Sequence, residues 1–157
     1  MNNIVKLIIS IAIPVAVGST AGFFTAGAVD NWYQTINKPT WNPPNRVFAP
    51  VWTMLYVMMG VALFFVWKSE ASSVLKKKAV TLFAAQLILN FFWSFIFFYQ
   101  HQPGWALVEI VVMWVSILLT IFAFAKVSKT AAWLLVPYIS WVSFAAILNY
   151  AIWQLNK

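Results

Sequence analysis

Hydrophobic residues in this chain form long continuous runs and do not alternate with polar ones. Five such runs cover residues 7–29, 47–67, 79–99, 105–125 and 131–155. A bilayer core about 30 Å thick needs roughly 20 residues of apolar helix, and each run reaches that length. Membrane strands would instead alternate over about 10 residues. The pattern predicts an all-α fold, an integral membrane bundle of five transmembrane helices, in a single domain over residues 1–157.

The first run also permits a second interpretation, as a cleaved signal peptide. Lys6, the apolar core after it and Ala26-Gly27-Ala28 imitate the charged start and the cleavage site of such a peptide. The apolar stretch is longer than the usual signal core of about 7–15 residues. It also contains Gly18 and Gly22, a small-xxx-small spacing that lets membrane helices approach closely. We therefore expect a retained helix.

Composition agrees with a protein that lies in lipid. Hydrophobic residues make up 63% of the chain and charged residues 8%, whereas a soluble domain has about 25% charged residues. There is no cysteine, which excludes disulfides, thiolate metal sites and cysteine nucleophiles. The net charge of +7 comes from cations in short connectors, so it indicates membrane topology and no nucleic-acid partner.

Those cations are divided unequally between the two sides of the predicted bundle. One side carries seven, which are Lys6, Lys68, Lys76, Lys77, Lys78, Lys126 and Lys129. The other carries three, which are Lys38, Arg46 and Lys157. In a plasma membrane, cytoplasmic loops carry the excess of Lys and Arg. We therefore expect a cytoplasmic N-terminus, with residues 30–46 and the C-terminus outside.

Polar and aromatic residues inside the predicted spans form stripes along single helix faces. The stripes comprise Gln86, Asn90, Trp93 and Phe97 in the third span, Trp105 and Glu109 at the start of the fourth, and Tyr138, Trp141, Ala145 and Leu148 in the fifth. Each also has a structural interpretation. Amides bond neighbouring helices, Trp residues anchor at the membrane interface, and an acid near a helix start interacts with the dipole.

The shared depth of these aromatic and polar residues in the membrane favours a functional site. Trp52, Trp93, Trp105 and Trp141, together with Asn90 and Glu109, all fall in the outward half of their spans. An aromatic-walled cavity with few polar groups suits a large, flat, largely apolar ligand. No metal site is expected, because the single His101 cannot form one alone.

The loop of residues 30–46, here called the strap, is stiff and aromatic. Its prolines fix φ, so the loop loses little entropy when it becomes ordered. Its aromatic rings can cover apolar surface at the mouth of the bundle. These residues are Pro39, Pro43, Pro44, Trp32, Tyr33 and Trp41. We interpret the strap as a lid.

Short motifs follow one another along nearly the whole chain. They are Trp32-Tyr33, Lys38-Pro39-x-Trp41-x-Pro43-Pro44, Pro50-Val51-Trp52-Thr53-x-Leu55-Tyr56, Gln86-Leu87-x-Leu89-Asn90-x-x-Trp93, Gly104-Trp105-Ala106-Leu107-Val108-Glu109, Pro137-Tyr138-x-x-Trp141 and Leu148-Asn149-Tyr150. In order and spacing they resemble the signature of the TspO/MBR family of tryptophan-rich sensory proteins. The mitochondrial relatives in that family are called translocator protein or peripheral benzodiazepine receptor.

The resemblance implies a five-helix bundle, commonly a homodimer, with a pocket open towards the first loop. Family ligands include porphyrins such as protoporphyrin IX, isoquinoline carboxamides and benzodiazepines, and no cofactor is implied. Carried over by position, the residues that line the pocket are Tyr33, Trp52, Asn90, Trp93, Trp105, Glu109, Trp141, Ala145 and Leu148. Trp52 and Trp141 also stand at positions implicated in light-driven porphyrin breakdown.

Three functions stay open from the sequence. The first is a tetrapyrrole-binding sensor or scavenger, the second an enzyme for light- and oxygen-dependent porphyrin breakdown with Trp52 and Trp141 as catalytic residues, and the third a small-molecule transporter. No acid–base pair or nucleophile supports hydrolytic chemistry. A cholesterol motif is incomplete, because Gln154 stands where a basic residue should follow Leu148 and Tyr150. Cholesterol transport is therefore not expected.

Overall fold

Helices make up the whole fold of the computed structural model, which describes residues 1–157. In chain order they are α1 (Asn3–Asp30), α2 (Trp32–Thr35), α3 (Asn45–Lys68), α4 (Ser73–Ser94), the π-helical turn η1 (Phe95–Tyr99), α5 (Pro103–Ala125), α6 (Lys129–Leu134) and α7 (Val136–Asn156). They group into 5 stretches long and apolar enough to cross a membrane. The prediction of an all-α bundle with five membrane-spanning helices is confirmed.

The helices extend a few residues beyond the hydrophobic runs because polar caps set their ends. Asn2 Oδ1 accepts hydrogen bonds from the backbone N–H groups of Ile4 and Val5 at the start of α1. Ser72 Oγ accepts one from Leu75 at the start of α4. Such caps satisfy backbone donors that the first turn leaves free, so the helix continues past the last apolar residue.

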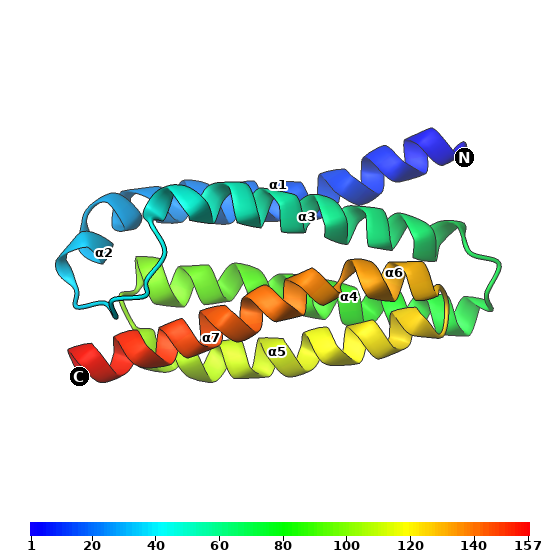
Figure 1. Cartoon of the computed structure of the whole chain (residues 1–157). Helices are drawn as coiled ribbons and strands as arrows, with labels where there is room; N and C mark the ends of the chain where they lie inside the picture. Colours follow the sequence, from blue (N-terminus) through cyan, green and yellow to red (C-terminus); the bar gives the residue numbers. More distant parts are fainter.

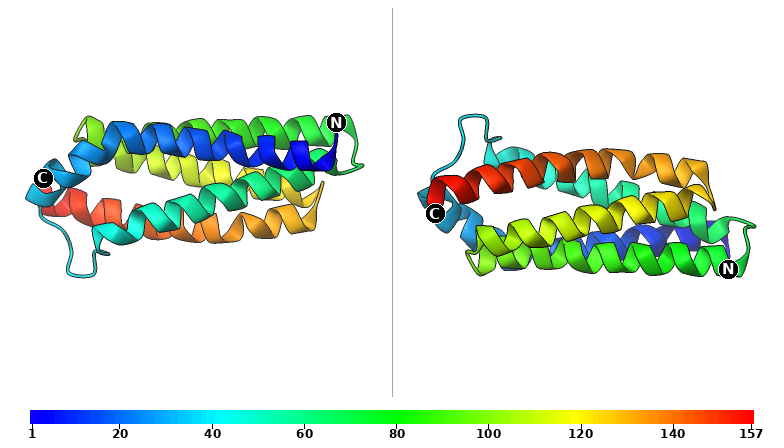
Figure 2. Two further views of the ribbon diagram at one scale, coloured as in Figure 1. Left: turned by 90° about the horizontal axis from the view of Figure 1, so that it is seen from above. Right: turned by 90° about the horizontal axis from the view of Figure 1, so that it is seen from below.

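The five spans run side by side with the two termini at opposite ends of the bundle (Figure 1). Helix α1 packs along α3, α4 packs along α5, and α5 also packs along α7. The views from above and below show the same layers, with α2 and the strap wrapped over the end that carries the C-terminus (Figure 2). An odd number of spans places the termini on opposite sides of a membrane.

The fifth span is broken at Leu135, between α6 and α7. Pro137 has no N–H group and cannot donate to the carbonyl one turn earlier. Leu135 N instead donates to Ala132 O at 3.1 Å in a tighter turn. As a result α6 packs against α3, whereas α7 packs mainly against α5. The break thus separates α7 from α3 at the end of the bundle that carries the strap.

Glycine allows the closest approach between α1 and α3. A Cβ atom at Gly60 would overlap with the backbone of Ile11 and lie 2.8 Å from Ser10 O. Gly18 faces the ring of Tyr56 in the same molecule. The spacing of Gly18 and Gly22 therefore makes room inside this chain and gives no support to a helix pair between two copies, so homodimerisation remains a prediction.

Candidate functional site

A cavity of about 450 Å³ lies between α1, α3, α4 and α7 beneath the strap. Sites for small organic molecules measure about 300–1,000 Å³. Most of the wall is apolar, and much of it is aromatic. The aromatic residues are Tyr33, Phe48, Trp52, Tyr56, Trp93, Phe97, Phe98, Trp141 and Phe144. The cavity therefore has the size and surface of a site for an aromatic ligand.

Small side chains of α1 form the opposite wall. They repeat every three or four residues and so share one helix face. The residues are Gly18, Ala21, Gly22, Thr25 and Ala26. A Cβ atom at Gly22 would meet nothing within 4 Å. The small residues of α1 therefore set the width of the cavity, and Gly22 faces open space within it.

Six of the nine residues expected from the sequence line this cavity. They are Tyr33, Trp52, Trp93, Trp141, Ala145 and Leu148. They come from α2, α3, α4 and α7, so the structure brings together residues more than a hundred positions apart. Trp141, Ala145 and Leu148 share one face of α7, as their spacing predicted.

Asn90 does not line the cavity and lies one layer behind it. Its side chain is 2% exposed, and a polar group buried to that degree needs partners. Tyr56 OH donates to Asn90 Oδ1 at 2.6 Å, and Asn90 Nδ2 donates to Tyr138 OH at 2.9 Å. Tyr138 OH donates in turn to Gln86 Oε1 at 2.7 Å. Asn90 therefore acts on the cavity through Tyr56, whose ring it holds in place.

Trp105 and Glu109 also lie away from the wall, contrary to the expectation from the resemblance. No residue of α5 lines the cavity, because α5 packs on the far side of α4 and α7. Trp105 is 70% exposed, which fits the alternative role of a Trp anchor at the membrane interface. Both carboxylate oxygens of Glu109 are buried without a hydrogen-bond partner.

The residues carried over from the resemblance leave out several aromatic residues of the wall, and two of these, Tyr56 and Phe48, are ones that spacing along α3 places beside Trp52. Tyr56 follows Trp52 by four positions, and Phe48 precedes Trp52 by four, so the three share one face of α3. The rings of Trp52 and Tyr56 stack with centroids 5.8 Å apart. Trp52 and Trp93 lie 6.4 Å apart at an interplanar angle of 31°. This aromatic row provides a nearly continuous surface on which a flat molecule could stack.

One buried polar atom of the wall has no hydrogen-bond partner. Trp141 Nε1 is buried and donates no hydrogen bond, whereas Trp93 Nε1 donates to Asn149 Oδ1 at 3.0 Å. Leaving a buried donor unpaired costs about 1–3 kcal/mol. An acceptor on a bound ligand would recover that free energy. The indole N–H of Trp141 is therefore the best-placed group for a directional contact with a ligand.

The strap is tied to the far end of the chain. Asn37 N donates to Asn156 Oδ1 at 2.9 Å, and Asn156 Nδ2 donates to Asn37 O at 2.7 Å. The Trp41 ring packs edge-on against Phe144 with centroids 5.9 Å apart. Lys38 Nζ donates to Tyr33 O at 2.6 Å. These contacts hold the strap across the end of the bundle and over the cavity.

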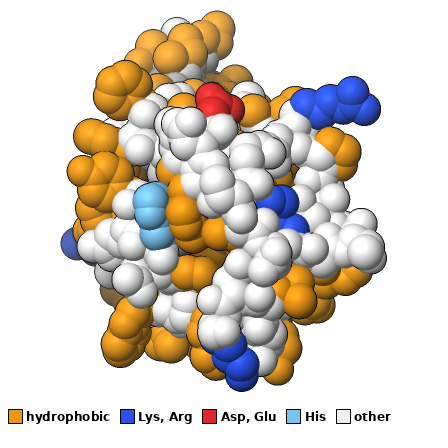
Figure 3. Space-filling model, turned by 90° about the vertical axis from the view of Figure 1, so that its left-hand side faces the viewer, with side chains coloured by type: hydrophobic (Ala, Val, Ile, Leu, Met, Phe, Trp, Pro, Cys, Tyr) orange, Lys and Arg blue, Asp and Glu red, His pale blue; other side chains and the backbone are white.

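A second contact fixes α2 to the connector between η1 and α5. The ring of Trp32 stacks on His101 with centroids 4.5 Å apart and an interplanar angle of 6°. Seen from this end, backbone and other side chains (white) cover most of the middle of the surface, with hydrophobic patches (orange) among them and more around the rim (Figure 3). The strap therefore turns Tyr33, which is 2% exposed, towards the cavity and leaves Trp41 46% exposed.

Comparisons with known proteins agree with this architecture. The model of the TspO/MBR family matches residues 10–154. The chain is 48% identical to the tryptophan-rich protein TspO of Chlorobaculum tepidum over 98% of both chains. It is 41% identical to the translocator protein of Homo sapiens over 85% of this chain and 79% of that one. It is 38% identical to the tryptophan-rich sensory protein of Cereibacter sphaeroides over 84% of this chain and 83% of that one.

Proposed function

This chain belongs to the TspO/MBR family, and from that premise we propose that it binds a porphyrin such as protoporphyrin IX as a sensor or scavenger. The observation that carries the proposal is the aromatic cavity of about 450 Å³ beneath the strap. Flat aromatic ligands stack on Trp and Tyr rings, and each ring pair contributes about 0.5–1.5 kcal/mol beyond the buried area. Isoquinoline carboxamides and benzodiazepines would occupy the same cavity.

The charge and polarity of the cavity wall indicate how an anionic porphyrin would be oriented when bound. Asp30 is the one charged residue of the wall. It ends α1 at the mouth beside the strap and is exposed to solvent. Because moving a carboxylate from water into an apolar cavity is costly, the propionate groups of a porphyrin would stay in water at the mouth of the cavity, turned away from Asp30. The apolar edge of the macrocycle would then face Trp52 and Trp141.

The composition of the wall favours binding through the macrocycle over binding through a metal. Haem iron is held by His, Cys, Met or Tyr, and the wall contains no His, Cys or Met. Its tyrosine hydroxyls are already bonded, Tyr33 to Asn42 and Tyr56 to Asn90. We therefore expect metal-free and iron protoporphyrin to bind with similar affinity, and the Soret band of the iron form to show no new axial ligand.

Titration of the purified protein with protoporphyrin in darkness tests the proposal. Porphyrins absorb where Trp emits, so binding should quench the tryptophan fluorescence saturably, and an isoquinoline carboxamide should restore it by competition. Empty detergent micelles with free tryptophan derivative serve as the control for partitioning. Quenching that grows linearly with porphyrin and resists competition would contradict a specific site.

A second function is favoured by the positions of two residues. Trp52 and Trp141 both line the cavity, so each could contact a bound porphyrin. We therefore keep light- and oxygen-dependent porphyrin breakdown as the alternative function, with these two residues as the reactive groups. In that alternative, the wild-type protein should bleach bound porphyrin in light faster than detergent alone does.

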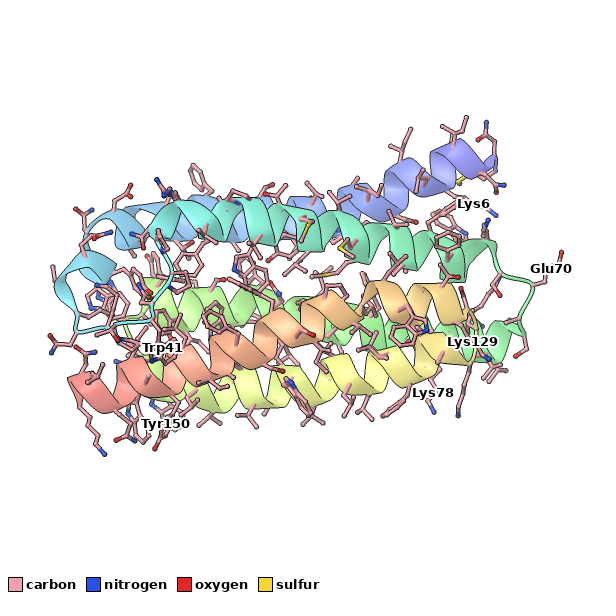
Figure 4. The ribbon with its side chains drawn as sticks, viewed as in Figure 1. Lys6, Trp41, Glu70, Lys78, Lys129 and Tyr150 are labelled. Carbon is pink, nitrogen blue, oxygen red and sulfur yellow. The ribbon has the colours of Figure 1, made fainter.

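We further propose that the protein lies in the plasma membrane with its lysine-rich end in the cytoplasm. Lys6, Lys78 and Lys129 gather at one end of the bundle, and Trp41 of the strap lies at the other (Figure 4). Loops rich in Lys and Arg stay in the cytoplasm during insertion. The cavity would then open to the outer side of the membrane.

A further inference from the structure

A second, smaller groove lies at the lysine-rich end, on the outer face of the α4–α5 pair. Its volume is about 190 Å³. Two lysines and five apolar residues line it, and no residue of the first cavity takes part. The lining residues are Leu75, Lys78, Leu82, Leu119, Phe122, Ala123 and Lys126. This groove is independent of the porphyrin site and of the function proposed for it.

Helices α4 and α5 each contribute the residues of a single helix face to the groove. On α4, Leu75, Lys78 and Leu82 are spaced by three and four positions and share one face. On α5 and its C-cap, Leu119, Phe122, Ala123 and Lys126 show the same periodicity. Phe122 is 60% exposed and Leu119 49% exposed. The apolar part of the groove therefore faces outward, where hydrocarbon chains lie in a membrane.

The two lysines of the groove and its deepest apolar residues lie at different depths in the membrane. Helix α4 begins and α5 ends at the lysine-rich end, so both lysines lie nearer the membrane surface than the deepest leucines. Lys126 stands two helical turns from Leu119, which is about 10 Å at 1.5 Å per residue. Lys78 stands one turn from Leu82. A molecule that fits has an anionic head and an apolar tail, in that order from the surface.

The lysines of the groove are not engaged elsewhere in the protein. At the same end of the bundle, Lys76 Nζ donates to Trp67 O at 3.0 Å, and Lys68 lies over the Phe65 ring. Lys78 and Lys126 make no contact of either kind. The acidic residues of the chain, Asp30, Glu70 and Glu109, do not line the groove. Its positive charge is therefore available to an external anion.

We propose that this groove binds an anionic phospholipid of the leaflet at the lysine-rich end. Lys78 and Lys126 hold the headgroup phosphate from two helices, and one acyl chain lies along Leu82, Leu119 and Phe122. Basic pockets between membrane helices on the cytoplasmic side bind anionic headgroups. A bilayer supplies this amphiphile at high local concentration, already oriented with its headgroup at the level of the lysines.

Thermal unfolding in detergent tests the proposal, with lipid added at increasing mole fraction. The lipids are phosphatidylglycerol and phosphatidylcholine with identical acyl chains, and glycerol 1-phosphate serves as the headgroup alone. The double variant Lys78→Gln/Lys126→Gln removes the groove charges. Its matched control, Lys77→Gln/Lys129→Gln, removes the same charge from exposed positions at the same end that do not line the groove.

Phosphatidylglycerol should stabilise the wild type at a lower mole fraction than phosphatidylcholine. The groove variant should weaken the apparent affinity for phosphatidylglycerol about 30-fold, because each lysine near the surface contributes on the order of a factor of five. The control variant should change it less than about threefold. Equal losses in the two variants, equal effects of the two lipids, or full stabilisation by glycerol 1-phosphate alone would each overturn the proposal.

Discussion

At the scale of single residues, the proposed function depends on the indole rings of Trp52 and Trp141. Both line the cavity, but their surroundings differ. Trp52 lies within the aromatic row of α3 and α4, beside Tyr56 and Trp93. Trp141 adds an unpaired N–H group. A wall residue contributes contact area, whereas a reactive residue contributes an oxidisable π-system, and replacement by Phe separates the two roles.

If the two residues are walls, Trp52→Phe should weaken porphyrin binding by about 0.5–1.5 kcal/mol. Trp141→Phe should cost somewhat more, because the N–H group that it removes is buried and free to bond the ligand. Porphyrin loss in light, measured by absorbance at saturating ligand, should then equal that of the wild type. If they are reactive, the loss at saturation should nearly vanish while binding survives. Trp133→Phe is the control, since Trp133 is 72% exposed and does not line the cavity.

Helical spacing explains which parts of the site could be predicted from the sequence and which could not. Trp93, Trp141, Ala145 and Leu148 lie where helical periodicity placed them, because spacing along one helix determines which residues share a face. Trp105 was expected on the wall and lies outside it. Periodicity does not reveal which neighbouring helix a face meets, and α5 meets the outer side of α4 and α7.

At the scale of elements, the wall formed by α1 was the hardest part to foresee. Most of its residues are glycine, alanine, serine or threonine, which carry no chemical signal of a binding site. Their spacing suggested close packing of helices, and Gly60 of α3 in fact provides the close approach. The five spans themselves were predictable, because a bilayer requires continuous apolar helices and leaves few alternatives.

At the same scale, we predict that the strap controls the escape of a ligand from the cavity. Asn156→Ala would remove the reciprocal pair of hydrogen bonds with Asn37. These bonds are exposed, so we expect a loss of about 1 kcal/mol. Dissociation of porphyrin in a stopped-flow chase should become about fivefold faster, with little change in the association rate.

Gln154→Ala provides the matched control for this variant. Gln154 lies on the same last turn of α7 and makes no hydrogen bond to the strap. Its dissociation rate should stay at the wild-type value. An unchanged rate in Asn156→Ala as well would mean that the strap is a connector and not a lid.

At the scale of the whole molecule, charge distribution and architecture predict one orientation. The absence of cysteine allows single cysteines to report it without background. A membrane-impermeant thiol reagent added to intact cells should label Thr40→Cys in the strap. The same reagent should leave Ser73→Cys unlabelled until the cells are opened. Labelling of Ser73→Cys alone in intact cells would show the reverse orientation.

Two glycines of α1 allow the cavity as a whole to be tested. A Cβ atom would meet nothing within 4 Å at either Gly22 or Gly27, so a side chain can be attached at both positions without a clash at its first carbon. Gly22 lines the cavity and Gly27 does not. Both substitutions also replace a helical glycine, so their effects on helix propensity are the same.

The most direct test of porphyrin binding in this cavity therefore compares Gly22→Phe with Gly27→Phe. The dissociation constant of protoporphyrin is measured for each variant by fluorescence titration in darkness. The phenyl ring at position 22 would occupy space that the porphyrin needs. Binding should weaken at least about tenfold in Gly22→Phe, which corresponds to about 1.4 kcal/mol, and stay at the wild-type value in Gly27→Phe. Equal affinity in the two variants would show that the porphyrin binds outside this cavity.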